Sequence, residues 1–215
     1  MTGLIILAGG AASRFNEKPF YKFRGKEMLG VIYNNLAEGF DEVVVSVKQM
    51  HAERVSKVVN AEIVLDEYAL DTPLVGILSA CSNMSSERVF VVPCDVPMIK
   101  KDVVEIILSK LNKDAAVPKW EDGQIEPLVA AYKREKIAKG CKEALNAKKM
   151  RVRDALDGLD VQYVNTDLLK EIDPELLSFR NVNTKDDLLD LEKKHRRDKF
   201  LNSRHFRDYD TKPFK

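Results

Sequence analysis

The sequence predicts an α/β fold: a Rossmann-like, open and mostly parallel sheet with helices on both faces and an antiparallel extension. Three observations predict it. The chain has 215 residues, 45% of them apolar, which is enough for one substantial core. In the first half, short β-branched runs alternate with amphipathic segments of helical length, the pattern of βαβ units. From about residue 114 this alternation loosens, and two short apolar runs flank a turn.

The parallel part of the sheet is predicted from four apolar runs, at residues 4–7, 43–47, 63–65 and 89–92. Apolar residues that recur every three or four positions predict helices around residues 28–36, 55–59 and 103–111. Parallel strands joined by right-handed crossovers bind ligands at their carboxyl ends. We therefore expect the functional residues just after each strand.

The antiparallel extension is predicted from residues 115–118 and 124–132, which flank the turn-like Glu121-Asp122-Gly123. A further strand is expected at residues 161–164. Farther on, a helix is expected at residues 185–194, because Thr184 can cap it and acidic residues fill its first turn.

Residues 1–194 are expected to form one domain, and residues 195–215 a basic tail. Residues 192–215 hold nine Lys or Arg against four Asp or Glu. Disorder is the expectation for the tail, with docking or subunit contact as the alternative.

Charge and composition exclude several classes of protein. Lys and Arg number 35 against 34 Asp and Glu, so the net charge of +1 gives no general attraction to nucleic acid or to an anionic membrane. No apolar run approaches the roughly 20 residues that span a bilayer. The first residues lack the basic region of a signal peptide, and a cytoplasmic location is expected. The three cysteines have no metal-ligand spacing, so neither a zinc site nor structural disulfides are expected.

The first chemical motif is a glycine-containing loop at residues 7–19, directly after the first strand. Gly9 and Gly10 allow the backbone to approach a ligand, and exposed N–H groups of such a loop bind phosphate oxygens. Arg14 and Lys18 add positive charge. The alternative is an ordinary strand-to-helix turn with two solvated cations.

The second motif is Asp95, which an apolar strand delivers to the carboxyl edge of the sheet. A hard cation such as Mg²⁺ that bridges substrate phosphates would suit this carboxylate. The alternative is a capping role for the helix that begins near Lys100. The adjoining Cys94 is interpreted as a small core residue.

Two weaker motifs follow the third strand and precede the last helix. Asp66 ends the third strand, and Pro73 opens a helix whose amino terminus would suit an anion. Asn181 and Asn183 lie on one face of an extended segment and can read the hydrogen-bonding edge of a ligand. Asx turns are the competing interpretation of these two amides.

Five motifs occur in one order along the chain: Leu7-Ala8-Gly9-Gly10 with Arg14 and Lys18-Pro19, Pro73-Leu74-Val75-Gly76-Ile77, Pro93-Cys94-Asp95-Val96-Pro97, Glu126-Pro127-Leu128 and Arg180-Asn181-Val182-Asn183-Thr184. Together they resemble the molybdenum cofactor guanylyltransferase family of the nucleotidyltransferase superfamily. The resemblance covers roughly residues 3–190. The first motif alone fits any nucleotidyltransferase of this superfamily, whereas the later motifs favour the molybdopterin branch. It implies the glycosyltransferase-A-like fold of that superfamily.

By this resemblance, the chain would move GMP from GTP to Mo-molybdopterin and release pyrophosphate, with Mg²⁺ as cofactor. The implied GTP ligands are Leu7, Ala8, Gly9, Gly10, Lys18, Asp66 and Asp95, with Asp95 also on Mg²⁺. Arg14, Lys18 and Asp95 would be the catalytic residues, and Asn181 and Asn183, with the Glu126-Pro127-Leu128 turn, would bind the pterin phosphate. Transient contact with molybdoenzymes or other cofactor-synthesis proteins is expected. Binding to nucleic acid or to a membrane is not expected.

The chain departs from the family pattern at two positions, because Asn16 and Thr72 stand where the family commonly has glycine. Three alternative functions stay open: a cytidylyltransferase for the same pterin, a nucleotidyltransferase for a sugar or other phosphate, and a non-catalytic protein that keeps the fold to dock a partner.

Overall fold

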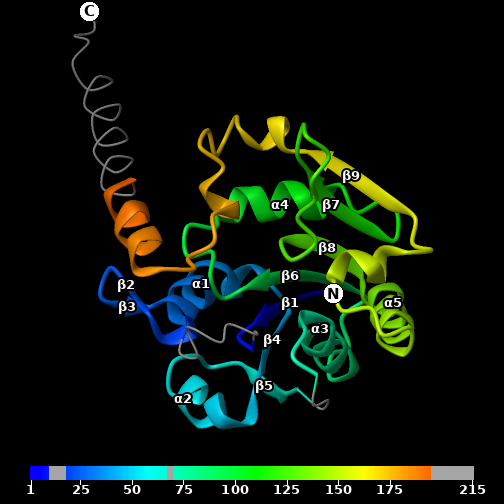
Figure 1. Cartoon of the computed structure of the whole chain (residues 1–215), viewed down its shortest axis with the longest axis horizontal. Helices are drawn as coiled ribbons and strands as arrows, with labels where there is room; N and C mark the ends of the chain where they lie inside the picture. Colours follow the sequence, from blue (N-terminus) through cyan, green and yellow to red (C-terminus); the bar gives the residue numbers. More distant parts are fainter. Residues whose placement is uncertain (10–17, 67–69, 195–215) are drawn as a thin grey trace, which may run out of the picture.

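The structure, a computed structural model, describes residues 1–9, 18–66 and 70–194. Its centre is a seven-stranded sheet with the strand order β5-β4-β1-β6-β8-β7-β9 (Figure 1). The strands are β1 (Thr2–Leu7), β4 (Glu42–Val47), β5 (Glu62–Leu65), β6 (Arg88–Pro93), β7 (Ala115–Lys119), β8 (Ala130–Lys133) and β9 (Val161–Asn165).

The pairing of the strands confirms a mostly parallel sheet with an antiparallel extension. β1 pairs in parallel with both β4 and β6, and β4 pairs in parallel with β5. β8 runs antiparallel to its neighbours β6 and β7, and β7 pairs in parallel with β9. The direction of β8 therefore separates the four-stranded parallel half from the β7–β9 half.

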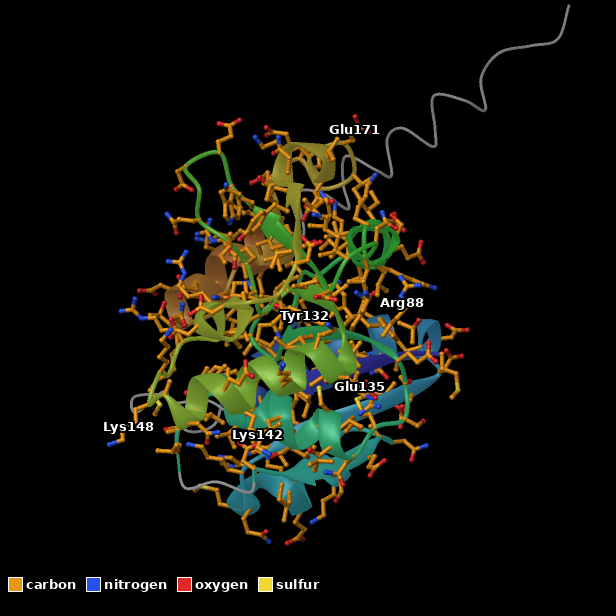
Figure 2. The ribbon with its side chains drawn as sticks, turned by 90° about the vertical axis from the view of Figure 1, so that its right-hand side faces the viewer. Arg88, Tyr132, Glu135, Lys142, Lys148 and Glu171 are labelled. Carbon is orange, nitrogen blue, oxygen red and sulfur yellow. The ribbon has the colours of Figure 1, made fainter. Side chains whose placement is uncertain are left out.

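Helices cover both faces of the sheet (Figure 1). They are α1 (Met28–Leu36), α2 (Ala52–Ser56), α3 (Pro73–Ser82), α4 (Lys101–Ser109) and α5 (Arg134–Asn146). Alternate side chains of the central strands pack into two cores. Leu4 and Ile6 lie in the core under α1 and α4, whereas Ile5 and Leu7 lie in the core under α3 and α5. Figure 2 shows the face that α5 covers, where Tyr132 of β8 is fully buried.

Single-turn 3-10 helices connect these elements, and a small hairpin adds a second sheet. The turns are η1 (Lys18–Phe20), η2 (Ala37–Gly39), η3 (Gln49–His51), η4 (Val152–Leu156), η5 (Thr166–Leu169) and η6 (Leu177–Phe179). The hairpin joins β2 (Lys22–Phe23) to β3 (Lys26–Glu27). It packs against a helix at residues 185–194, because Phe23 and Leu191 belong to one buried cluster.

The predicted cap of the helix at residues 185–194 is confirmed. The backbone N–H of Asp187 donates to Thr184 Oγ1 at 3.1 Å. Two predicted boundaries differ. α2 ends at Ser56, since Lys57 and Val58 donate to carbonyls three residues back. β8 begins only at Ala130, because Pro127 has no N–H to give to a ladder.

The predicted tail at residues 195–215 lies outside the described residues. Within the part of the chain that the structure describes, no helix is long and apolar enough to cross a membrane.

Candidate functional site

The carboxyl ends of the parallel strands meet at one edge of the sheet, as predicted. In the register, Leu7 of β1 stands opposite Ser46 of β4 and Pro93 of β6. The ladder continues past the strands, because Ala8 N–H donates to Ser46 O at 2.8 Å and Cys94 N–H donates to Leu7 O at 3.0 Å. The sheet thus brings the start of the glycine loop and the loop that carries Asp95 to one edge.

Asp66 extends the same edge beyond β5. Its N–H donates to Val47 O at 3.1 Å, and its Oδ1 accepts a hydrogen bond from the buried Ser46 hydroxyl at 2.5 Å. Burial raises the pKa of Asp66, while the Ser46 hydrogen bond and the Lys48 charge act in the opposite direction. In the sheet order, β4 and β1 separate Asp66 from Asp95, so the two carboxyls lie on different parts of the edge.

Gly9 lies directly against this carboxyl. A Cβ at Gly9 would stand 2.6 Å from Asp66 Oδ2, closer than real Cβ atoms come to any neighbour. Any larger residue at this position would have to displace the Asp66 carboxyl, whose other oxygen is bonded to Ser46, so the position favours glycine, and the backbone of the loop passes beside Asp66. Gly76 of α3 also packs closely against the protein itself, because a Cβ there would meet Ser46 Oγ at 2.7 Å.

Asp95 is joined to the segment of the two asparagines. Val182 N–H donates to Asp95 O at 2.8 Å. The Val182 side chain is buried, whereas Asn181 and Asn183 on either side of it are exposed, so the predicted alternation is confirmed. Oδ1 of the Asp95 carboxylate is buried. The helix-cap alternative is wrong, because the N-cap of α4 is Lys100.

A cleft of about 570 Å³ opens beside Asp95. Asn181 shares its lining, together with residues 122–129, Pro73 and Pro93, and residues 150–153. The cleft thus brings together Asp95, one of the two amides and the Glu126-Pro127-Leu128 turn, which come from three distant parts of the chain. Asn183 and Asp66 are not among the residues that line it.

Glu126 lines this cleft, and Trp120 holds it from behind. The indole N–H of Trp120 donates to Glu126 Oε1 at 2.8 Å, and its ring packs edge-on against Phe179 with centroids 5.8 Å apart. Burial raises the pKa of Glu126, and the hydrogen bond from Trp120 partly offsets this. Tyr132 supports the Glu126-Pro127-Leu128 turn from the core, because its hydroxyl donates to Pro127 O at 2.6 Å.

Two arginines that the sequence reasoning missed, Arg151 and Arg153, also line the cleft. Thr72 holds their segment in place: its Oγ1 donates to Met150 O at 2.7 Å and accepts from Leu74 N–H at 3.3 Å. The threonine at a family glycine position therefore caps α3 and ties it to the arginine segment. The signal in the sequence was the Arg-Val-Arg triplet at residues 151–153, whose valine is buried in the structure and begins η4.

Part of the predicted site lies outside the residues that the structure describes. Gly10 and Arg14 fall within residues 10–17, which the structure does not describe, and Lys18 is placed only through its backbone at the start of η1. Phe20, at the end of η1, is buried and lies under the Arg54 guanidinium, 3.9 Å from the ring centroid. The end of the glycine loop is thereby anchored to α2. That Lys18 and Asp95 bind the same GTP molecule stays a prediction.

The Asp95 carboxylate at this edge suits a magnesium ion whose other ligands come from substrate phosphates. Among the described residues, no group of three or more His, Cys, Asp or Glu is placed to hold a metal by itself. Mg²⁺ is commonly bound by one or two carboxylates plus substrate phosphates and water, and a single carboxylate with one buried oxygen meets that requirement.

Comparisons with known proteins agree with this architecture. The family model of the MobA-like NTP transferase domain matches residues 4–161. Relatives from Methanosarcina mazei and Methanosarcina acetivorans, both named "Probable molybdenum cofactor guanylyltransferase", are 31% and 32% identical, over 86% of this chain and 87% of each relative. The crystal structure of molybdopterin-guanine dinucleotide biosynthesis protein A from Archaeoglobus fulgidus superposes with a TM-score of 0.78 at 27% identity, over 91% of this chain and 99% of that one. The chain therefore belongs to the family of MobA-like NTP transferases.

Proposed function

We propose that this chain transfers GMP from GTP to Mo-molybdopterin, with release of pyrophosphate and formation of molybdopterin guanine dinucleotide. The observation that carries the proposal is the hydrogen bond from Val182 N–H to Asp95 O. It joins the backbone of Asp95, whose carboxylate lies at the nucleotide edge, to the amide segment, defined as residues 181–183, beside one cleft. The names of the relatives supply the base and the acceptor.

The nucleotide side comprises residues that follow β1 and β5. Backbone groups of Leu7, Ala8, Gly9 and Gly10 would hold GTP, and Asp66 would contact its nucleoside end. The support is positional, since Gly9 and Asp66 are in steric contact at the sheet edge. Arg14 and Lys18 would neutralise the triphosphate, a role that suits the cations of a loop after the first strand.

The acceptor side comprises the cleft, which Asn181 lines, and the rest of the amide segment beside it. Asn181 and Asn183 would donate and accept hydrogen bonds with the pterin phosphate, next to the Glu126-Pro127-Leu128 turn. Arg151 and Arg153 bring two guanidinium groups to this cleft, beside the carboxyls of Asp95, Asp122 and Glu126, and guanidinium groups are the side chains that best bind a phosphate.

The reaction needs no protein nucleophile. A terminal phosphate oxygen of the acceptor attacks the α-phosphorus of GTP, the bond from that phosphorus to the bridging oxygen breaks, and pyrophosphate leaves with the electron pair. The residues of the chain hold two polyanions in line and offset the charge that moves toward the leaving group. Asp95 would hold Mg²⁺, which when bound supplies further charge neutralisation at the phosphates.

The test is pyrophosphate release by the full chain with GTP, molybdopterin and Mg²⁺ together. We expect release only with all three present, and a product that carries guanine. CTP, ATP and UTP serve as matched controls. Faster release with CTP would favour a cytidylyltransferase, and no binding of any nucleotide in a thermal-shift assay would favour the non-catalytic alternative.

A further inference from the structure

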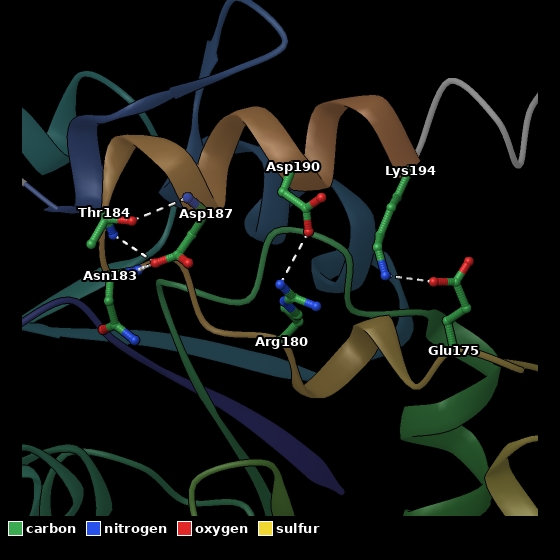
Figure 3. Close-up of polar contacts among 7 residues, drawn as sticks. All are labelled: Glu175, Arg180, Asn183, Thr184, Asp187, Asp190 and Lys194. Atoms are coloured by element: carbon green, nitrogen blue, oxygen red, sulfur yellow. Dashed lines mark hydrogen bonds and ion pairs between the residues drawn. The ribbon is translucent and has the colours of Figure 1, made fainter.

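The helix at residues 185–194 lies along the segment that leads into the two asparagines (Figure 3). Polar side chains at three positions of the helix, spaced by three and four residues, face that segment, as expected for one helical face. The contacts join Asp187 to the backbone of Asn183 and Thr184, Asp190 to Arg180 at 3.0 Å, and Lys194 to Glu175 at 2.6 Å.

The contact made by Asp187 differs from the other two. Arg180 and Asp190 are each 45% exposed, and exposed ion pairs contribute little. Asp187 Oδ2 instead accepts two backbone N–H groups, from Asn183 at 2.9 Å and from Thr184 at 2.8 Å. Hydrogen bonds to an ionised carboxylate are stronger than neutral ones. The hydrogen bond from Asn183 N–H is the main cause that lowers the pKa of Asp187.

These two hydrogen bonds fix one end of the amide segment. At its centre, the Val182 side chain is buried among Met28, Met98 and Leu191. On the side of the sheet, Val182 N–H is bonded to Asp95 O. The backbone of the segment is therefore held at consecutive residues by groups from two separate elements. Asn181 and Asn183 project on the opposite side from Val182.

We infer that Asp187 is a positioning residue for the acceptor: by binding the backbone N–H groups of Asn183 and Thr184, it sets the direction in which the amides of Asn181 and Asn183 point. This inference rests on the proposed function, because it takes the amide segment as the acceptor side of the site. Asp187 itself faces the backbone of the segment, so its effect reaches the acceptor only through the asparagines.

The experiment measures KM for molybdopterin, KM for GTP and kcat in the pyrophosphate-release assay with the full chain. Asp187→Ala removes both hydrogen bonds. Asp187→Asn keeps an acceptor oxygen in place without the charge. Asp186→Ala is the matched control, because Asp186 is exposed in the same first turn and its loss changes the net charge equally.

Asp187→Ala is expected to raise KM for molybdopterin about tenfold, because asparagine amides that are no longer held in place lose about one hydrogen bond to the charged phosphate. KM for GTP should stay within about twofold of the wild type, since the hydrogen bonds of Asp187 go to Asn183 and Thr184 and not to the nucleotide side. Asp187→Asn should restore most of the loss, and Asp186→Ala should match the wild type. If Asp187→Ala does not fold, Asp187→Ser, whose side chain is too short to reach both N–H groups, replaces it.

Two results would overturn the inference alone: a wild type that turns over while Asp187→Ala keeps its KM for molybdopterin, or equal losses in Asp187→Ala and Asp186→Ala. An equal rise of both KM values would indicate a general structural role and also overturn it. A wild type that releases no pyrophosphate with molybdopterin would instead overturn the proposed function, and the inference with it.

Discussion

The nucleotide side and the acceptor side of the site are built in different ways. Residues of the nucleotide side follow β1 and β5, and the backbone ladder of the parallel sheet places them. The acceptor side is assembled from residues 122–129, 150–153 and 181–183, which lie outside the parallel strands and have only isolated backbone bonds to the sheet, such as Glu126 N–H to Pro118 O. Side chains add an anchor to each of these segments: Trp120 and Tyr132 to the first, Thr72 to the second and Asp187 to the third.

This difference decides how substitutions act. On the nucleotide side the sheet holds the backbone in place. A substitution there changes one side chain, so its effect is confined to that group. On the acceptor side the loss of one anchor releases a whole segment, so residues without contact to substrate control binding. The substitutions below test this contrast.

Asp95 should show the largest effect, because both sides of the site meet at this residue. We expect Asp95→Ala to lower kcat by at least about 10²–10³-fold, the loss typical of one preorganised electrostatic group. The fold should persist, since the bond to Val182 uses the backbone carbonyl of Asp95. Pyrophosphate release and the melting temperature measure the two properties, and Asp95→Asn separates charge from shape. Wild-type turnover by Asp95→Ala would remove the residue from the mechanism.

Gly9 tests the nucleotide side alone. Gly9→Ala places a Cβ 2.6 Å from Asp66 Oδ2, and overpacking of this kind costs about 1–3 kcal/mol. GTP affinity should fall, while the affinity for molybdopterin stays unchanged. Isothermal titration with each ligand measures both. In the background Asp66→Ala the clash is gone, so Gly9→Ala should cost clearly less there; an equal cost in both backgrounds would contradict the steric explanation.

The same contrast explains what could be predicted from the sequence. Strands that end in Leu7, Leu65 and Pro93 carry local signals, and parallel topology alone brings the residues after them to one edge, so Gly9, Asp66 and Asp95 were identified. Asn181 and Asn183 were found because Val182 sets a two-residue alternation.

The rest of the acceptor side depends on contacts between residues far apart in the chain. Nothing in the sequence around Arg151 and Arg153 indicates that the hydroxyl of Thr72, 78 residues before Met150, holds their segment. The late start of β8 has a different cause. It follows from Pro127, a local signal that the apolar pattern around it concealed.

Thr72 tests the arginine segment. Thr72→Val keeps the shape but removes the hydroxyl, and with it both the cap of α3 and the bond to Met150. We expect a loss of about 1 kcal/mol in the free energy of unfolding, typical of a lost N-cap, and a weaker affinity for molybdopterin. GTP affinity should not change. Thr72→Ser retains the hydroxyl and should behave as the wild type in urea unfolding and in titration; equal loss in both variants would assign the effect to packing.

Glu126 should show the smallest effect, and the size of this effect depends on pH. Burial raises the pKa of Glu126 above its ordinary value of 4.5, so the folded state binds the proton more tightly than the unfolded state. Stability therefore falls as the pH rises from about 4.5 through the pKa of the folded state, because ionisation then places a charge in a half-buried site. Glu126→Gln keeps an oxygen that accepts from Trp120 but carries no charge. Its melting temperature should exceed that of the wild type slightly at pH 7 and equal it at pH 4. A variant that is less stable than the wild type at pH 7 would mean that the ionised carboxylate stabilises this wall of the cleft.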